Sequence, residues 1–452
     1  MRSIETTPLE EWIRLRIGKE GGQLARSEIE AWQLGALKET LAFVKERSPF
    51  YKEHLSGMEP EDFDCLSDVG RIPFMKASDI VEQGNRLICV SQNEIRRIVT
   101  LDTSGTTGNP KRIHYTDGDQ ELTIDFFHHG MATFTEAGDR VLVLLPGRMP
   151  GSIGDLLRTG LGRKGVEAIV YGIVDDCEAV MDIILERNIT GIVGIPQQLA
   201  ALAQSERSSL VKDIGKLRSV LLSTDYVSPA ISERIGRAWG CSVYEHYGMT
   251  EMGLGGGVFC KAFTGYHLRE ADMLFEIIDP LTGSNVPDGT FGEVVFTTLT
   301  RTAMPLIRYR TGDWSRFLSK ACSCGTILKT MERVRHRITA AVVLEDGLVL
   351  TMPMLEDILF TIDEITDFDA NIDKAAGQLD ILVNTAGEPE WLKPVILSKL
   401  ENSILKDTIS AGSLKINIGR QGCKAPDIKA IRKRNLMEIN RRTDNDNIVQ
   451  II

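Results

Sequence analysis

Long hydrophobic runs are missing from this 452-residue sequence. The longest apolar stretches, such as residues 141–145, have the length of a strand and fall far below the roughly 20 residues that a membrane-spanning helix needs. Residues 1–10 also lack the order of basic and then apolar residues that marks a secretory signal. We therefore expect a cytoplasmic protein without a membrane partner.

Positive charge and cysteine are scarce as well. The 63 acidic residues outnumber the 52 basic ones and give a net charge of -11. This charge argues against a nucleic-acid partner, because phosphate backbones demand a basic face. The 8 cysteines are scattered along the chain and do not form the dense pattern of a disulfide framework. We therefore expect the thiols to be reduced.

The order of the expected elements indicates an α/β protein. A chain of this length exceeds one ordinary core, so about two or three domains are expected. Between residues 97 and 247, short apolar runs alternate with helical stretches, which predicts a largely parallel sheet. After residue 248 strands and turns dominate, and a small α+β segment ends the chain. The sequence thus predicts a large domain, residues 1–332, with mixed, mostly parallel sheets and a β-rich part, followed by a small domain, residues 333–452.

A loop rich in small and hydroxyl side chains lies between two expected strands at residues 103–111. Small residues let the backbone approach a phosphate closely, while hydroxyl groups and a lysine add donors and positive charge. A surface turn is the simpler alternative for such a cluster. The loop lacks the spacing of a P-loop, but it resembles the first signature of the adenylate-forming superfamily, which handles the β- and γ-phosphates of ATP. The residues that carry this expectation are Thr103, Ser104, Gly105, Thr106, Thr107, Gly108 and Lys111.

Two further segments resemble signatures of this superfamily, in the family's order. The first contains Tyr247, Gly248, Thr250 and Glu251. The resemblance implies that the aromatic ring lies against adenine, that the threonine meets the α-phosphate, and that the glutamate helps to hold Mg²⁺, a hard cation that prefers carboxylate oxygen. The second segment ends in Asp313, and the resemblance implies that this carboxylate accepts hydrogen bonds from both ribose hydroxyls. Each segment alone is also compatible with an ordinary strand end or turn.

Within the superfamily, the chain resembles the phenylacetate–CoA ligase branch, which includes the coenzyme F390 synthetases. Residues 48–51, 72–74 and 296–310 carry this resemblance, which runs over nearly the whole chain. It implies an AMP-forming acid–thiol ligase that uses ATP to activate a carboxylic acid, on the branch's pattern an aryl acid such as phenylacetate, and then transfers the acyl group to CoA. It also suggests a homodimer. The alternatives are a different acceptor, such as a carrier protein, an amine or an F420-like cofactor, or a non-catalytic nucleotide-binding relative.

The family resemblance further implies that the C-terminal domain is mobile and carries a lysine that contacts the reacting groups. Lys429 is the candidate for this lysine, and a surface lysine on a basic helix is the alternative. At the hinge, Arg333 matches the family's arginine, but Arg335 and His336 replace its paired acids. These replacements put the second half-reaction in doubt more than the first.

Three cysteines and one histidine form a candidate structural zinc site. They are Cys260, His267, Cys322 and Cys324, and three thiolates with one imidazole would complete the closed tetrahedral shell that structural Zn²⁺ prefers. A similar set occurs in some members of the branch, and unpaired cysteines beside an ordinary histidine are the alternative.

Candidates for the wall of an acyl pocket are fewer. His246 directly precedes Tyr247, and Phe126, Phe127 and the pair Ile195-Pro196 lie near the ends of expected elements. Packing in the core is the simpler explanation for each of them.

Overall fold

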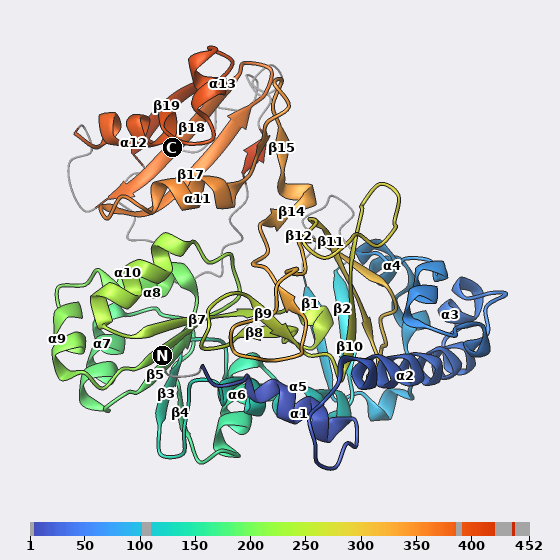
Figure 1. The fold of residues 1–452 in the computed structure, drawn as a ribbon. Coiled ribbons are helices and arrows are strands. Elements are labelled where there is room, and N and C mark those ends of the chain that lie inside the picture. The colour runs from blue at the N-terminus through green and yellow to red at the C-terminus, as the bar shows by residue number, and fades with distance from the viewer. Residues whose placement is uncertain (1–3, 102–109, 386–390, 421–435, 439–452) are drawn as a thin grey trace.

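The computed structural model describes residues 4–101, 110–385, 391–420 and 436–438 (Figure 1). A large body of helices and sheets carries a smaller C-terminal part, drawn in orange and red above it (Figure 1). The predicted α/β class is confirmed. Across the part of the chain that is described, no helix combines the length and the apolar character needed to cross a membrane.

An 8-stranded sheet forms the centre of the large body, in the order β13-β9-β8-β7-β6-β5-β3-β4. Its parallel half is the alternating region expected from the sequence, with β3 (Arg140–Val143), β4 (Glu167–Val170), β5 (Gly191–Gly194), β6 (Ser219–Leu222) and β7 (Ser242–Tyr247). Three short antiparallel strands extend it: β8 (Gly257–Phe259), β9 (Tyr266–Leu268) and β13 (Thr330–Met331).

The two faces of the parallel strands are both buried, and successive residues alternate between them. Val141, Val143 and Leu221 pack in the core that contains α5 (Asp117–Met131) and α6 (Ile153–Gly162). Their neighbours Leu142 and Leu222 pack in a second core. The helices of the second core are α7 (Cys177–Glu186), α8 (Pro196–Ala203), α9 (Ser208–Ile214) and α10 (Pro229–Trp239). The sheet is therefore a layer between two sets of helices.

A second, antiparallel sheet supplies the β-rich part. Its strands are β10 (Met273–Ile278), β11 (Gly292–Thr298), β12 (Tyr309–Ser315) and β14 (His336–Arg337). A separate hairpin pairs β1 (Arg97–Leu101) with β2 (Lys111–Tyr115). The helices that precede it in the chain are α1 (Pro8–Arg16), α2 (Arg26–Arg47), α3 (Pro49–His54) and α4 (Ala77–Gln83).

The C-terminal part has its own 4-stranded sheet in the order β19-β18-β17-β20. These strands are β17 (Ile365–Asp373), β18 (Gln378–Thr385), β19 (Lys415–Arg420) and β20 (Met437–Glu438), and a small hairpin of β15 (Val342–Val343) and β16 (Val349–Leu350) precedes them. The helices are α11 (Met352–Leu359), α12 (Leu392–Glu401) and α13 (Lys406–Ser410). Because β14 still pairs with β12, residues 336–337 belong to the large body's second sheet. The boundary after residue 332 stays a prediction.

The small C-terminal part docks on α10 and the segment before it through polar contacts. Arg234, in α10, donates to the carbonyl oxygens of Phe360 (2.8 Å) and Ile362 (3.0 Å), at the end of α11. The Tyr226 hydroxyl donates to the Asp357 carboxylate at 2.9 Å. Unpaired carbonyls at a helix C-terminus attract a cation, so Arg234 holds this part of the chain by completing α11.

Candidate active site

Glu251 is the centre of the first group of site residues. It lies in a short 3₁₀ turn (Thr250–Met252) that follows β7, and its buried carboxylate forms an ion pair with Lys111 at the start of β2. The Tyr309 hydroxyl donates to the same carboxylate oxygen at 3.1 Å. Burial works against the charged form, but the Lys111 ammonium and these hydrogen bonds outweigh it, so the pKa of Glu251 lies below its usual value. An ionised carboxylate is thus held beside a cation.

Asp313 is the centre of the second group. Its buried carboxylate accepts a hydrogen bond from the Tyr247 hydroxyl at 2.8 Å and another from Arg337 Nε at 3.2 Å. Burial raises the pKa of Asp313, although the Arg337 guanidinium and the Tyr247 hydroxyl oppose this shift. The predicted ribose ligand and the predicted adenine-contacting ring are therefore direct neighbours. Arg337 was missed in the sequence, since no motif marks it.

The backbone of the 247–255 loop explains its small residues. A side chain at Gly248 would place Cβ 2.5 Å from the carbonyl oxygen of Leu254, so only glycine fits there. The carbonyl of Thr250 accepts a hydrogen bond from the Tyr115 hydroxyl, which ties this loop to β2. The loop that carries Glu251 is thus fixed to the strand that carries Lys111.

Only some of the other predicted nucleotide ligands lie in the part of the chain that the structure describes. The register of the first hairpin pairs Leu101 with Lys111, so the predicted phosphate loop connects two paired strands. Arg333 pairs instead with Glu245 on β7, with Nε 2.7 Å from Oε2. Predicted residues that lie outside the described part of the chain are Thr103, Ser104, Gly105, Thr106, Thr107, Gly108 and Lys429.

A narrow apolar cavity lies between α5, α6 and the carboxyl ends of β5, β6 and β7. In open parallel sheets this edge is where ligands bind. Of the candidates for an acyl pocket, Phe126, Phe127 and His246 line the cavity, whereas the Ile195-Pro196 pair does not. The wall residues that were missed share the apolar pattern of core residues and carry no separate signal: Met131, Leu145, Ile153, Leu157, Val193, Leu221 and Val258.

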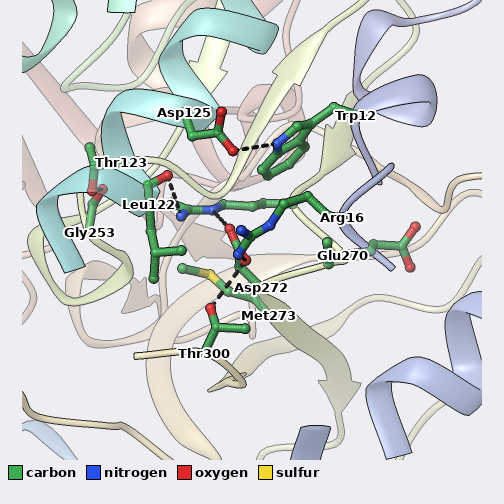
Figure 2. Close-up of polar contacts among 12 residues, drawn as sticks. Trp12, Arg16, Leu122, Thr123, Asp125, Gly253, Glu270, Asp272, Met273 and Thr300 are labelled. Atoms are coloured by element: carbon green, nitrogen blue, oxygen red, sulfur yellow. Dashed lines mark hydrogen bonds and ion pairs between the residues drawn. The ribbon is translucent and has the colours of Figure 1, made fainter. Parts of the chain in front are cut away.

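A polar cluster ties α1 to α5, one of the helices that line the cavity (Figure 2). Trp12 Nε1 donates to Asp125 at 2.7 Å, and Arg16 forms an ion pair with Asp272 at 2.9 Å. The Arg269 guanidinium also pairs with Asp272, at 2.7 Å, and lies 5.3 Å from the centre of the Phe126 ring. Residues far apart in the sequence thus fix the helix that supplies the phenylalanines of the cavity.

The four predicted metal ligands converge in one place. Cys260, His267, Cys322 and Cys324 are all buried, and their ligand atoms lie within 4.8 Å of one another. Cys324 Sγ lies 3.5 Å from His267 Nε2, while the Thr330 hydroxyl lies 3.4 Å from the other ring nitrogen. Nitrogen and sulfur donors in this arrangement fit a tetrahedral Zn²⁺ site, with a second group fixing the orientation of the imidazole.

Comparisons with known proteins agree with this architecture. Residues 97–300 match the family model of AMP-binding enzymes. Over 375 residues the chain is 30% identical to the phenylacetate-coenzyme A ligase of Thermus thermophilus, covering 79% of this chain and 81% of the relative. The chain belongs to the phenylacetate-coenzyme A ligase family. The Escherichia coli K12 member of this family is 28% identical, over 74% of this chain and 76% of its own.

Solved structures show that the fold is shared more widely. A 2-hydroxyisobutyryl-CoA ligase in its postadenylation state, at 19% identity, has a TM-score of 0.80 and covers 93% of this chain and 91% of its own. The same ligase in its thioesterification state has a TM-score of 0.66 at 20% identity, with 92% of this chain and 91% of its own covered. At this level of identity the likeness concerns the fold alone.

Proposed function

We propose that this protein activates a carboxylic acid with ATP as an acyl-adenylate and then transfers the acyl group to CoA. The observation that carries this proposal is the adjacency of two sites. Tyr247, which donates to Asp313, directly follows His246, which lines the apolar cavity. A nucleotide held at Asp313 and an acid held in the cavity would therefore meet at the end of β7. Membership of the phenylacetate-coenzyme A ligase family supports the same reaction.

In the first step, the acid carboxylate attacks the α-phosphorus of ATP and pyrophosphate leaves. Asp313 offers its carboxylate to the ribose hydroxyls, and Lys111 turns from Glu251 toward the departing phosphates. The buried, ionised carboxylate of Glu251 fits a hard cation. Mg²⁺ bound there would neutralise charge that develops between the phosphates. We propose, from the family resemblance, that Lys429 and Thr250 contact the reacting groups.

In the second step, the C-terminal domain turns and the CoA thiol attacks the acyl carbonyl, which releases AMP. The larger TM-score with the postadenylation structure supports an arrangement that precedes this turn. Arg234 and Tyr226, which hold the C-terminal part on the large body, would have to release their partners. Transfer to another acceptor, favoured by the replaced acids at Arg335 and His336, is the second candidate.

An aryl acid such as phenylacetate is the substrate class that we propose. The cavity is lined almost wholly by apolar side chains, including Phe126 and Phe127, and aromatic rings pack well against one another. The relatives from Thermus thermophilus and Escherichia coli are phenylacetate-coenzyme A ligases.

We also propose that the cluster of Cys260, His267, Cys322 and Cys324 holds a structural Zn²⁺. Four protein ligands would leave no open position for catalysis. The metal would pin β9 to the segment before β13, and β8 separates β9 from β7, the strand that carries Tyr247. Every cysteine in the described ranges is free of a disulfide bond, which supports a reducing, cytoplasmic location.

A homodimer and a mobile domain of residues 333–452 complete the proposal, and both rest on the family resemblance.

Pyrophosphate release from MgATP tests the proposal, measured over aryl, aliphatic and amino acids with and without CoA. We expect release with an aryl acid and a sharp rise when CoA is added. Release that is indifferent to CoA would contradict the proposed acceptor and favour a carrier protein, an amine or an F420-like cofactor. The absence of pyrophosphate release with every acid would contradict the proposed reaction and favour a non-catalytic relative.

A further inference from the structure

His246 is a polar group in a cavity whose other walls are almost wholly apolar. Among the described residues that line this cavity, the polar side chains are His246 and Ser223. The Ser223 hydroxyl lies 2.9 Å from His246 Nδ1, whereas Nε2 is buried without any hydrogen-bond partner. A buried polar atom without a partner costs about 1–3 kcal/mol, so such atoms call for an explanation.

The loop after Tyr247 leaves room around this imidazole. A Cβ atom at Gly255 would lie 3.4 Å from His246 Nε2, and a Cβ at Gly248 would lie 2.8 Å from its Cε1. Both positions are glycine, so the ring sits directly under the loop that carries Glu251. Nε2 therefore lies close to the backbone of this loop, and His246 also lines the cavity.

The hydrogen bond between Ser223 and His246 determines whether Nε2 donates or accepts a hydrogen bond. A neutral imidazole carries one N–H and one acceptor nitrogen. The buried Ser223 hydroxyl places its proton best by donating to Nδ1, which leaves the N–H on Nε2 as a free donor. Burial lowers the pKa of His246 to about 4, so the ring is neutral near pH 7. The cavity thus offers one neutral donor and no counter-charge for a second carboxylate.

We infer that His246 is a specificity-determining residue, and that the acid taken by this site carries a neutral hydrogen-bond acceptor, such as a hydroxyl group, that reaches Nε2. This inference rests on the proposed function and narrows its substrate class. Sites built to hydrogen-bond a substrate group reject analogues that lack the group, because the buried site atom then stays unpaired. A second carboxylate is excluded, since it would be buried without a partner.

Matched acids test the inference. Phenylacetate is compared with its 2-, 3- and 4-hydroxy derivatives, with the α-hydroxy acid, and with the methyl analogue of each, by kcat/KM for pyrophosphate release. We expect one hydroxy acid to exceed both its parent and its methyl analogue by about tenfold or more. In His246→Leu this ratio should fall to near one, while His246→Gln, which keeps a donor, should retain part of it.

A matched control is His114→Leu, because His114 is a second buried histidine with an unpaired ring nitrogen, and it does not line the cavity. Its hydroxyl preference should equal that of the wild type. If the hydroxy acids and their parents react equally well in the wild type, the inference is wrong while the proposed function stands. A preference that survives in His246→Leu also overturns it. If His246→Leu does not fold, the same ratio in His246→Gln and Ser223→Ala decides, since both should lower it. If no acid gives pyrophosphate release, the inference and the proposed function are both wrong.

Discussion

The proposed nucleotide site and the cluster of three cysteines and one histidine differ in how their buried polar groups find partners. In the nucleotide site, Glu251 and Asp313 are each satisfied by a partner from a distant segment, Lys111 and Arg337 respectively. In the cluster, the four side chains face one another. We propose that the acids exchange their partners for a ligand, whereas the four side chains of the cluster keep one another or a single metal ion as partners. The first arrangement suits turnover, and the second suits permanent cross-linking.

The largest expected effect lies in the cluster. Cys324→Ser removes one of four ligands, so zinc bound per chain should fall from about one to near zero, and the free energy of unfolding should drop by more than about 4 kcal/mol. Metal analysis and denaturant unfolding measure both quantities. Cys89→Ser is the matched control, because Cys89 is a buried thiol outside the cluster. Equal metal content in the two variants would break the distinction between the regions.

In the nucleotide site, loss of charge should affect chemistry more than stability. Glu251→Gln keeps the size of the side chain but removes its charge, so adenylation should slow by about 10²–10³-fold, the scale for one transition-state contact. Pyrophosphate release at saturating MgATP measures this. Glu270→Gln is the control, because Glu270 is a buried carboxylate whose partner, Arg26, lies on α2. If both variants slow the reaction equally, Glu251 has no special role.

A smaller effect is expected at the ribose position. Asp313→Asn keeps one acceptor for the Tyr247 hydroxyl but weakens the hydrogen bonds that a carboxylate makes. The KM for ATP should rise by about tenfold, with a lesser change in kcat. An unchanged KM would show that Asp313 only anchors Arg337.

The smallest effect is expected on α5, a helix that forms one wall of the cavity and belongs to neither region. Burial disfavours the charged form of Asp125, yet hydrogen bonds from His129 and Trp12 lower its pKa to about 2. A depressed pKa contributes stability above the pKa of the unfolded chain, and this contribution is lost as pH falls from about 4 toward 2. Asp125→Asn should therefore cost about 1 kcal/mol at pH 7 and almost nothing at pH 2. A cost independent of pH would show that the carboxylate charge is not involved.

Much of this organisation was predictable because it rests on local pattern. The alternation of apolar strands and helices predicts the parallel sheet, and the motif around Tyr247 predicts a loop at the end of β7. The zinc candidates were also found, since Cys322 and Cys324 are two residues apart and few residue types bind zinc.

What escaped prediction depends on contacts between distant segments. Arg337 reaches Asp313 through the pairing of β14 with β12, and no local signal distinguishes it from its neighbours. Arg234 was missed because its role is to satisfy carbonyls of α11, which lies more than a hundred residues away. Most wall residues of the cavity were not predicted, because they are of the same apolar types as the residues of the core.

The most direct test of the central claim follows one oxygen atom. In an acyl-adenylate, a carboxylate oxygen of the acid becomes bonded to the α-phosphorus, and attack of the CoA thiol on the carbonyl leaves that oxygen on AMP. With an accepted acid labelled with ¹⁸O in its carboxylate, mass spectrometry should find one labelled oxygen in the AMP released with CoA. Label in inorganic phosphate, with ADP as the other product, would contradict the account.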